Sequence, residues 1–508
     1  MPRRGKGKLI MENIWNEFRA YCGKIEDLRN VAALLDYDQQ VVMPSGGATA
    51  RAEQAATISG IIHQLSTSAE LENFLEQLEQ KCEFLPAESV ERCLWQRMKR
   101  EFERSRRIPE KFVTQCAALE AQGYTKWMAA REEDDFSILS DTLTEIFRYK
   151  MEYVEFFPEY ENKYDALLAD YDRDITTENV LKIFDELKAP LQQLIALAGT
   201  DKATHLATGR VKFPAERQFN LARQLAGLVG FDLQNDGVMA LAEHPFTTTI
   251  GSNDVRITTN IDENDFISNI YSVLHEAGHG IFEQHCAPEL ARSVLSRDIS
   301  LSLHESQSRL WENMVGRSFS VTAKIYEMLK REFPGEVNFS AEDFFRRVNH
   351  VRPSLIRVEA DEVTYNMHII LRTELELAIV NGQLAVRDLP DAWNEKMHTL
   401  LGITPDSDLN GVLQDVHWPS GAIGYFPTYL LGNVIGGQIW SAVRQLPQIA
   451  SELELGETAA LRNYLIEHIY QYGGKYSAPE LLRKLYGTNL QVGCYVDYLN
   501  EKYQNIYR

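Results

Sequence analysis

The segment 262–279 constrains the fold of this chain more than any other stretch. An acidic start at 262–265 is followed by apolar residues at helical spacing, which predicts one helix across the segment. Histidines four residues apart on a helix project from one face about 6 Å apart, so His275 and His279 can reach one Zn²⁺. Glu276 then lies beside the metal, where it can take a proton from an activated water and pass it to a leaving amine.

Catalytic zinc sites need a third protein ligand, and Glu305 is the first candidate. It lies 26 residues after His279 (305 − 279), a distance that suits a ligand from a second helix. Ser302 and Glu305 also have the spacing of a capping box, so the glutamate could instead reach back to a helix start. Spacing alone does not decide whether Glu305 is a metal ligand or a helix cap. His304 competes as a ligand and His285 is nearby, but neither has a spacing that singles it out.

The rest of the chain reads as a mainly helical protein with one small β element. Helix starts are predicted at Thr176-Thr177, at Ser340 and at Asp388, with Pro190 as a stop signal for the first of these helices. Thr-rich and β-branched residues flank a turn within 246–260, which predicts a β-hairpin just before the motif helix.

Length and termini suggest how the chain is divided. At 508 residues the chain exceeds the size at which one core keeps growing, so we expect two packed lobes with a boundary near residue 240. Both lobes would belong to a single catalytic domain of residues 11–508. Residues 1–10 are basic and predict a disordered tail, and the helical pattern begins at Met11, which is an alternative start.

Charge and cysteine usage limit the classes of partner. Acidic side chains number 73 against 52 basic ones, a net charge of −21 that disfavours nucleic acid and anionic membranes as partners. No run reaches the roughly 20 apolar residues that a bilayer requires, so we expect no membrane association. The six cysteines form no Cys-x-x-Cys pair, which favours reduced thiols and a cytoplasmic location.

Several blocks of the sequence resemble the M32 metallocarboxypeptidases, the carboxypeptidase Taq family. The resemblance covers nearly the whole chain. The matching blocks are Asp38-Gln39-Gln40 with Met43-Pro44, Asp254-Val255-Arg256-Ile257-Thr258, His275 to His279, His304-Glu305-Ser306-Gln307-Ser308, Ile356 to Asp361, Gly411 to Trp418, and Gly424 to Tyr429.

This resemblance implies a long-helix, zincin-type peptidase fold with a deep active-site groove and the small β-hairpin beside the metal site. It also implies a homodimer that removes single C-terminal residues from peptides with broad specificity. Glu305 becomes the third metal ligand on this basis, beside His275 and His279.

A carboxypeptidase must bind a free C-terminal carboxylate, and the planar fork of arginine can donate two charge-assisted hydrogen bonds to it. The candidates are Arg256, Arg352 and Arg357, all in blocks that match the family, and the sequence does not choose among them. The alternative for each is an ion pair with a neighbouring carboxylate. Those neighbours are Asp254, Glu359 and Asp361.

The oxyanion formed when water attacks needs hydrogen-bond donors, and His417 and Tyr425 fit that role. Related zinc oligopeptidases place a histidine and a tyrosine over the metal, and here the two are 8 residues apart (425 − 417). Tyr429 is the competing tyrosine and another residue expected to contact substrate. The alternative is an aromatic cluster that packs against Trp418 and Phe426. His244, outside this group, could line the groove or be structural.

The sequence therefore predicts a zinc-dependent carboxypeptidase that acts on peptides with a free C-terminus. Co²⁺ or Mn²⁺ could replace Zn²⁺, because metal supply also decides occupancy. Two rival functions stay open: an endo-acting zinc oligopeptidase, and a non-catalytic protein that binds peptide or metal. The presence of Glu276 argues against the second.

Overall fold

Long helices make up most of the protein. The computed structural model describes residues 3–199, 211–297 and 299–507, with the side chains of residues 3–12 outside that description. Within these ranges the helices are accompanied by one three-stranded sheet, which confirms the mainly helical fold with a small β element.

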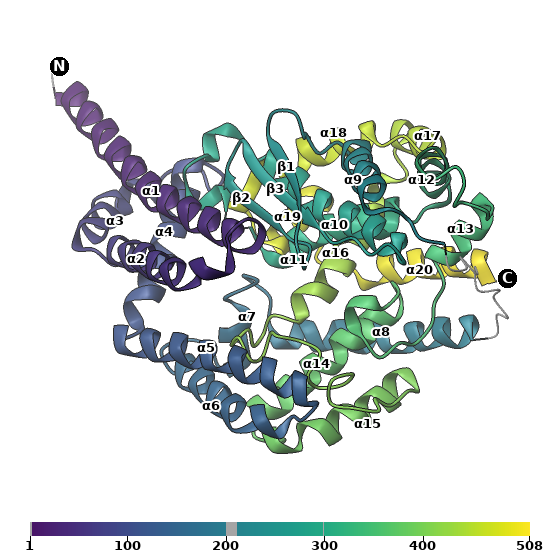
Figure 1. Ribbon diagram of the computed structural model, residues 1–508. Coiled ribbons are helices and arrows are strands. Elements are labelled where there is room, and N and C mark those ends of the chain that lie inside the picture. The colour runs from purple at the N-terminus through teal and green to yellow at the C-terminus, as the bar shows by residue number, and fades with distance from the viewer. Residues whose placement is uncertain (1–2, 200–210, 298, 508) are drawn as a thin grey trace.

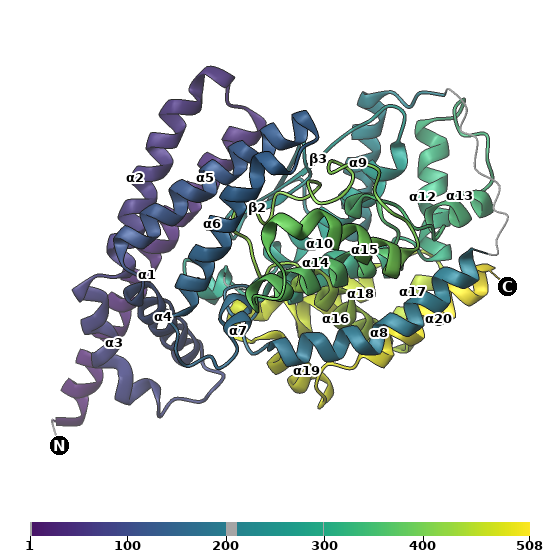
Figure 2. The same ribbon diagram turned by 90° about the horizontal axis from the view of Figure 1, so that it is seen from below.

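The first four helices form one end of the molecule (Figures 1 and 2). Three of them share an apolar core with the segment 290–295. The first helix begins at Arg3, inside the segment 1–10 that was expected to be a tail, and the disorder of that segment stays a prediction. The four helices are α1 (Arg3–Val41), α2 (Ala48–Ser66), α3 (Ala69–Cys82) and α4 (Val90–Arg107).

Six further helices lie together in the lower half of Figure 1. They are α5 (Glu110–Glu133), α6 (Ser137–Val154), α7 (Lys163–Leu168), α8 (Thr177–Ala198), α14 (Thr364–Val380) and α15 (Leu389–Leu401).

Helix α8 corrects one sequence prediction. Thr176 caps its start as expected, but Pro190 lies inside the helix and does not end it. A proline within a helix removes one backbone hydrogen bond. Here Leu191, Leu194 and Ala198 beyond it are buried, and that apolar packing carries the helix past the proline.

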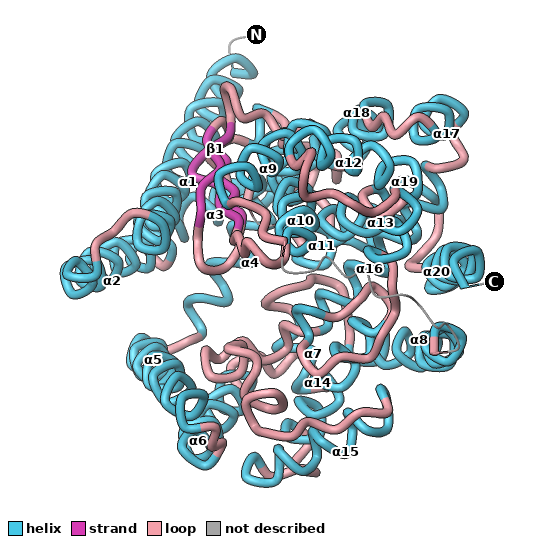
Figure 3. Tube along the Cα trace, turned by 45° about the vertical axis from the view of Figure 1, so that its right-hand side comes forward, coloured by secondary structure: helices cyan, strands magenta, loops and turns pink. Residues whose placement is uncertain are grey.

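The sheet lies between α1 and the motif helix (Figure 3). Strands β2 (Thr247–Gly251) and β3 (Asp254–Thr259) pair antiparallel, which confirms the predicted hairpin. Strand β1 (Gly237–Leu241), which the sequence analysis did not predict, pairs parallel to β3 and gives the order β1-β3-β2. Strand β2, one of the two edge strands, contacts both α1 and α10.

The motif segment forms α10 (Phe266–Gln284), as predicted. Asp265 caps it by accepting hydrogen bonds from the backbone N–H groups of Ile267 and Ser268. Helix α11 (Leu301–Arg309) packs against α10 and along α16 (Pro427–Val443), and it continues into a π-helix at Leu310–Val315. The elements that enclose the motif are therefore well separated in sequence.

The other helices complete the frame. The helix start predicted at Ser340 is that of α13, where Ser340 forms a capping box with Asp343, and Asp388 precedes α15 as expected. These helices are α9 (Ala215–Val229), α12 (Phe319–Glu332), α13 (Ala341–Val348), α17 (Pro447–Glu454), α18 (Ala459–His468), α19 (Ala478–Tyr486) and α20 (Val492–Tyr507). Short 3-10 helices lie at Ser45–Gly47, Pro288–Leu290, Val294–Ser296, Arg357–Glu359, Val386–Asp388 and Tyr470–Lys475.

One large apolar core joins most of these elements, and it includes side chains on both sides of residue 240. The single catalytic domain at 11–508 and its lobe boundary near 240 stay predictions. Among the described residues, no helix combines the length and apolar character needed to cross a bilayer.

Candidate active site

Two histidines of α10 face a glutamate of α11. Nε2 of His275 lies 3.6 Å and Nε2 of His279 lies 3.3 Å from Oε2 of Glu305. Their potential ligand atoms all lie within 4.8 Å of one another. Two imidazoles and one carboxylate are a donor set that suits Zn²⁺ and leaves a coordination position open. The structure brings together the three residues predicted as ligands, and the donors present fit a divalent metal.

Helix capping does not explain Glu305. The first turn of α11 is capped by the buried Asp172, which accepts hydrogen bonds from the backbone N–H and the hydroxyl of Ser302. Glu305 instead accepts from Nε of Arg309 at 2.7 Å and from the Ser308 hydroxyl at 3.0 Å. Burial opposes ionisation of Glu305, yet the charges of Arg309 and His275 hold its pKa well below the usual value.

The neighbouring histidines make other contacts. His304 stacks on the ring of His279 with centroids 4.4 Å apart, and its Nε2 lies 3.0 Å from Oε1 of Glu283. His285 donates from Nδ1 to the carbonyl of Ile281 in its own helix at 2.8 Å. Neither belongs to the three-residue cluster.

Two charged residues that support the cluster were missed by sequence reasoning. Glu312 lies 2.9 Å through Oε2 from Nδ1 of His275, and Nη1 of Arg309 donates to the same oxygen at 3.2 Å. Arg309 therefore joins Glu305 and Glu312. A signal was available, because Glu312 follows Glu305 by seven residues (312 − 305), about two helical turns.

Glu276 is buried and directed toward the sheet. Its Oε2 accepts a hydrogen bond from Oγ1 of Thr247 on β2 at 2.6 Å. Burial raises the pKa of Glu276, while His275 and the bond from Thr247 act in the opposite direction. The threonines around Thr247 predict the hairpin, but nothing in their local pattern indicates a place in the site.

His417, Tyr425 and Tyr429 form one aromatic group. Nε2 of His417 lies 3.1 Å from the Tyr429 hydroxyl, and the His417 and Tyr425 ring centroids are 5.4 Å apart. Burial lowers the pKa of His417 to about 4 and raises that of Tyr425 to about 12, so both are neutral at pH 7. The charge of Glu305 contributes to the raised pKa of Tyr425, which places this tyrosine within electrostatic reach of the metal cluster.

The packing alternative for this group is also present. The ring of His417 lies against Phe426 with centroids 4.5 Å apart, and Phe426 packs edge-on to Trp418. The structure therefore brings the predicted donors together inside an aromatic cluster. Their roles in the reaction stay predictions.

The three candidate arginines lie in different surroundings. Arg256 on β3 makes a two-pronged ion pair with Asp254, at 2.8 and 2.7 Å, and lies over the ring of Tyr37. Arg352 is exposed, and its backbone N–H donates to Asp361 at 3.0 Å. Arg357 is buried.

Arg357 donates from Nη2 to Asp415 at 2.8 Å and from Nη1 to the Tyr365 hydroxyl at 3.1 Å. Its guanidinium lies 5.2 Å from the Tyr429 ring centroid. Arg357 is thus the one of the three candidates that contacts the aromatic group. His244 is exposed, and its carbonyl accepts a bond from the hydroxyl of Thr258.

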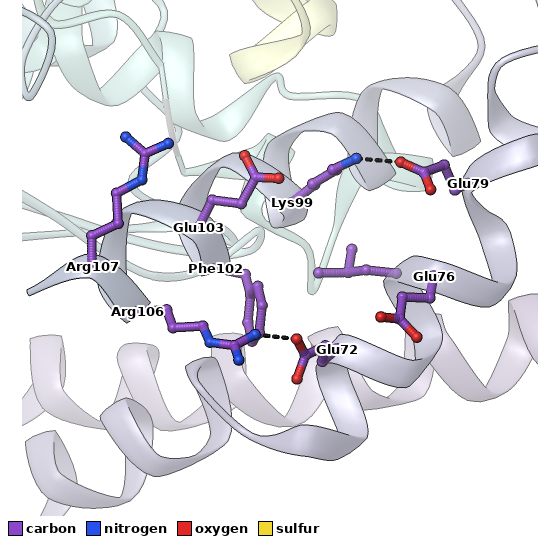
Figure 4. Close-up of a pocket in the computed structure, with 9 residues that line it drawn as sticks. Glu72, Glu76, Glu79, Lys99, Phe102, Glu103, Arg106 and Arg107 are labelled. Carbon is purple, nitrogen blue, oxygen red and sulfur yellow. Dashed lines mark hydrogen bonds and ion pairs between the residues drawn. The ribbon is translucent and has the colours of Figure 1, made fainter. Parts of the chain in front are cut away.

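A cavity of about 300 Å³ adjoins the site on the side of α1. Thr247 and His304 line it together with charged residues from α1, α10 and the segment 292–297. A second hollow of about 510 Å³ lies between α3 and α4 and shares no lining residue with the first (Figure 4). Its facing charges are paired as Arg106–Glu72 and Lys99–Glu79.

The fold and the cluster together define a class. A His–His–Glu donor set on two helices, with a buried glutamate beside it, is typical of metal-dependent peptide hydrolases. Residues 17–503 match the family described as Carboxypeptidase Taq (M32) metallopeptidase. The chain belongs to this family. The prediction of an enzyme of the metallocarboxypeptidase class is thereby confirmed.

The chain is similar to named carboxypeptidases over almost its full length. The chain is 34% identical to Carboxypeptidase 1 of Bacillus subtilis (strain 168) over 496 residues, which is 97% of this chain and 98% of the relative. It is 35% identical to Thermostable carboxypeptidase 1 of Thermus thermophilus over 491 residues, 94% and 96% of the two chains. The crystal structure of the M32 carboxypeptidase from Deinococcus radiodurans R1 superposes with a TM-score of 0.94 at 34% identity, covering 97% of this chain and 99% of that chain.

Proposed function

We propose that this protein is a zinc-dependent carboxypeptidase that hydrolyses the C-terminal peptide bond of peptides with broad specificity. The observation that carries the proposal is the convergence of His275, His279 and Glu305, with Glu276 beside them, in a chain of the M32 family. These three residues would hold the metal. When bound, it supplies Lewis-acid activation of water and of the scissile carbonyl. The donor set favours Zn²⁺, with Co²⁺ and Mn²⁺ as alternatives.

Glu276 acts as general base in this proposal. Its carboxylate accepts a proton from the attacking water and later gives it to the leaving amine. Burial raises its pKa, which makes the carboxylate a stronger base than an exposed glutamate. The Thr247 hydroxyl orients the carboxylate through the 2.6 Å hydrogen bond to Oε2.

His417 and Tyr425 stabilise the oxyanion by donating hydrogen bonds to it. The lowered pKa of His417 favours a neutral imidazole that can present an N–H at Nε2, and the raised pKa of Tyr425 keeps its hydroxyl protonated. The Tyr429 hydroxyl lies 3.1 Å from Nε2 of His417, so it can accept the Nε2–H in the free enzyme and contact substrate once Nε2 donates to the oxyanion.

The C-terminal carboxylate of the substrate is bound by one or more of Arg256, Arg352 and Arg357. Arg357 is favoured by its position against Tyr429, whereas the partly exposed guanidinium of Arg256 is already bound at two nitrogens by Asp254. Replacing each arginine by methionine separates them. The carboxylate receptor is the residue whose loss raises KM for free-acid peptides most.

Digestion of one peptide in free-acid and C-amidated forms tests the proposal, with mass spectrometry as the readout. The enzyme is first stripped with a chelator and then assayed with and without added Zn²⁺. Loss of single residues from the free-acid form alone, restored by Zn²⁺, is the expected result. Internal cuts in both forms would move the protein to the oligopeptidases, and no metal-dependent cleavage would favour a binding role.

Glu276→Gln tests the base separately. The variant should retain zinc but lose turnover by several orders of magnitude, and an unchanged rate would contradict the assignment.

A homodimer and a cytoplasmic location belong to the same proposal. The six cysteines are all free thiols in the structure, as expected in a reducing compartment. Sedimentation at two protein concentrations tests the dimer, and fractionation of source cells tests the compartment.

A further inference from the structure

A buried carboxylate lies behind the loop that carries His417 and Tyr425. Glu376 on α14 is fully buried, with 0% of its surface exposed. Its Oε1 accepts a hydrogen bond from Nε1 of Trp418 at 2.6 Å, and its Oε2 accepts one from the backbone N–H of Gly424 at 3.0 Å. Trp418 directly follows His417, and Gly424 directly precedes Tyr425. One side chain therefore binds the chain neighbours of both proposed oxyanion donors.

Three hydrogen-bond donors converge on Glu376, and each requires an acceptor atom. The third partner is the hydroxyl of the fully buried Tyr164 on α7, which donates to Oε2. All three donors are neutral. A buried carboxylate without a cationic partner is costly, so its presence here calls for a specific role. A glutamine would have only one acceptor oxygen, and its amide N–H groups would face at least one of the three donors.

The loop between Trp418 and Gly424 is held by apolar packing of the buried Trp418 and Ile423, but its polar contacts are few. Its turns are closed by short-range backbone bonds, such as Ala422 N–H to the His417 carbonyl at 2.8 Å. Gly424 has φ of +88°, a conformation that favours glycine. A Cβ at this position would lie 3.0 Å from Cβ of Leu167 on α7. The bonds to Glu376 thus fix the two ends of a loop that its own hydrogen bonds hold only locally.

We propose that Glu376 is a positioning residue for the hydrolytic reaction, which holds His417 and Tyr425 at a fixed separation through Trp418 and Gly424. This inference rests on the proposed function, since it takes His417 and Tyr425 as the oxyanion donors. Within the described residues, no hydrogen bond or ion pair joins Glu376 to His275, His279 or Glu305. Its loss should therefore disturb the geometry of the donors and leave the metal cluster in place.

The test compares Glu376→Gln with Glu374→Gln. Glu374 lies on the same helix, but it pairs with Lys188 and Lys396 at a half-buried position, so its substitution controls for loss of a carboxylate from α14. Steady-state kinetics and metal content are measured on each purified protein with a free-acid peptide. We expect Glu376→Gln to retain bound zinc and a KM within about threefold of the wild type, with kcat lowered roughly 10- to 100-fold. Glu374→Gln should retain the wild-type kcat.

A second variant keeps the test decisive if Glu376→Gln does not fold. Trp418→Phe removes one donor and leaves the carboxylate with its bonds from Gly424 and Tyr164. It should also lower kcat without loss of zinc. A merely structural role predicts the opposite pattern, in which stability falls but kcat per zinc-loaded molecule equals that of the wild type.

Combination with the donor variants separates this inference from the proposed function. If Glu376 acts through the donors, adding Glu376→Gln to His417→Ala/Tyr425→Phe should cost less than a further twofold in kcat. A multiplicative loss would overturn the inference. A wild-type kcat in Glu376→Gln, with a large loss in the donor double variant, would overturn the inference alone. A wild-type kcat in the donor double variant would overturn the donor assignment, and the inference with it.

Discussion

Nδ1 of His275 lies 2.9 Å from Oε2 of Glu312, on the side of the imidazole opposite the nitrogen that faces Glu305. Burial opposes ionisation of Glu312, but Arg309 and His275 lower its pKa to about 2, so it is an anionic acceptor at neutral pH. His275 therefore donates from Nδ1 and presents the lone pair of Nε2 to the cluster. Such carboxylate–histidine pairs fix the ligand tautomer and increase its basicity.

Replacing Glu312 by glutamine should weaken metal binding. The side chain keeps its size but loses the charge that orients His275, so we expect the metal dissociation constant to rise about 10- to 100-fold. Competition with a chromogenic chelator measures it. Glu374 pairs with Lys188 and Lys396 rather than with the cluster, so Glu374→Gln is the matched control. Equal affinities for the wild type and Glu312→Gln would show that the pair does not tune the ligand.

Thr247→Val should slow catalysis without removing the metal. Valine keeps the shape of threonine but loses the donor to Glu276, and a hydrogen bond of about 1 kcal/mol corresponds to a loss in kcat of roughly fivefold. Thr249→Val on the same strand is the control. The Thr249 hydroxyl is buried without a hydrogen-bond partner among the described residues. Stopped assays with saturating peptide should therefore separate the two variants, and similar rates would contradict the orienting role.

Gly432→Ala should disturb the helix contact behind Glu305. An added Cβ on α16 would lie 2.7 Å from Cγ and 2.9 Å from Cβ of Glu305. We expect a loss of about 1–3 kcal/mol in the free energy of unfolding and weaker metal binding. Gly60→Ala within α2, where a Cβ meets nothing within 4 Å, should instead stabilise by about 0.5–1 kcal/mol. Chemical denaturation of the metal-free proteins measures the free energy of unfolding of both variants. An unchanged value for Gly432→Ala would show that α16 and Glu305 can shift to admit the methyl group.

The buried Asp172 makes stability depend on pH. Burial raises its pKa to about 6, against the lowering effect of bonds from Ser300 and Ser302. An unfolded aspartate titrates near 3.9, so between about pH 4 and pH 6 the folded state binds more protons, and the free energy of unfolding falls as pH rises. Asp172→Asn removes this titration.

The stability of the wild type relative to Asp172→Asn should therefore fall by about 2 kcal/mol between pH 4 and pH 7. Urea unfolding of the metal-free proteins at several pH values gives this difference directly. Because both proteins share every other titrating group, a difference that stays constant with pH would show that folding does not raise the pKa of Asp172.

Local patterns in the sequence were sufficient for the elements that carry the cluster. The spacing of His275 and His279 and the acidic start of α10 are properties of one helix, and the turn chemistry of the β2–β3 hairpin is equally local. Glu305 needed the family resemblance, because its capping-box spacing with Ser302 offered an equal explanation. The structure resolves that ambiguity by placing Asp172 at the helix start.

The missed features all depend on contacts between distant segments. Strand β1 is stabilised by parallel pairing with β3, and no local pattern encodes a partner across the chain. The continuation of α8 through Pro190 depends on burial of later leucines. Thr247 and Glu376 acquire their importance only when α10 and the loop before α16 lie against them. Local secondary-structure propensity carries no information about these contacts between distant segments.

The π-helix at Leu310–Val315 makes the site sensitive to chain length. A π-helix closes its hydrogen bonds over five residues, one more than an α-helix, and Glu312 lies within it. Removing one residue would let the segment wind as an α-helix while the residues on either side kept nearly the same facing, because the wider π-turn is where the helix accommodates one extra residue. Among divergent sequences, a one-residue gap between Glu305 and Gly316 would thus mark a helix without the wider turn that carries Glu312 beside His275 in this chain.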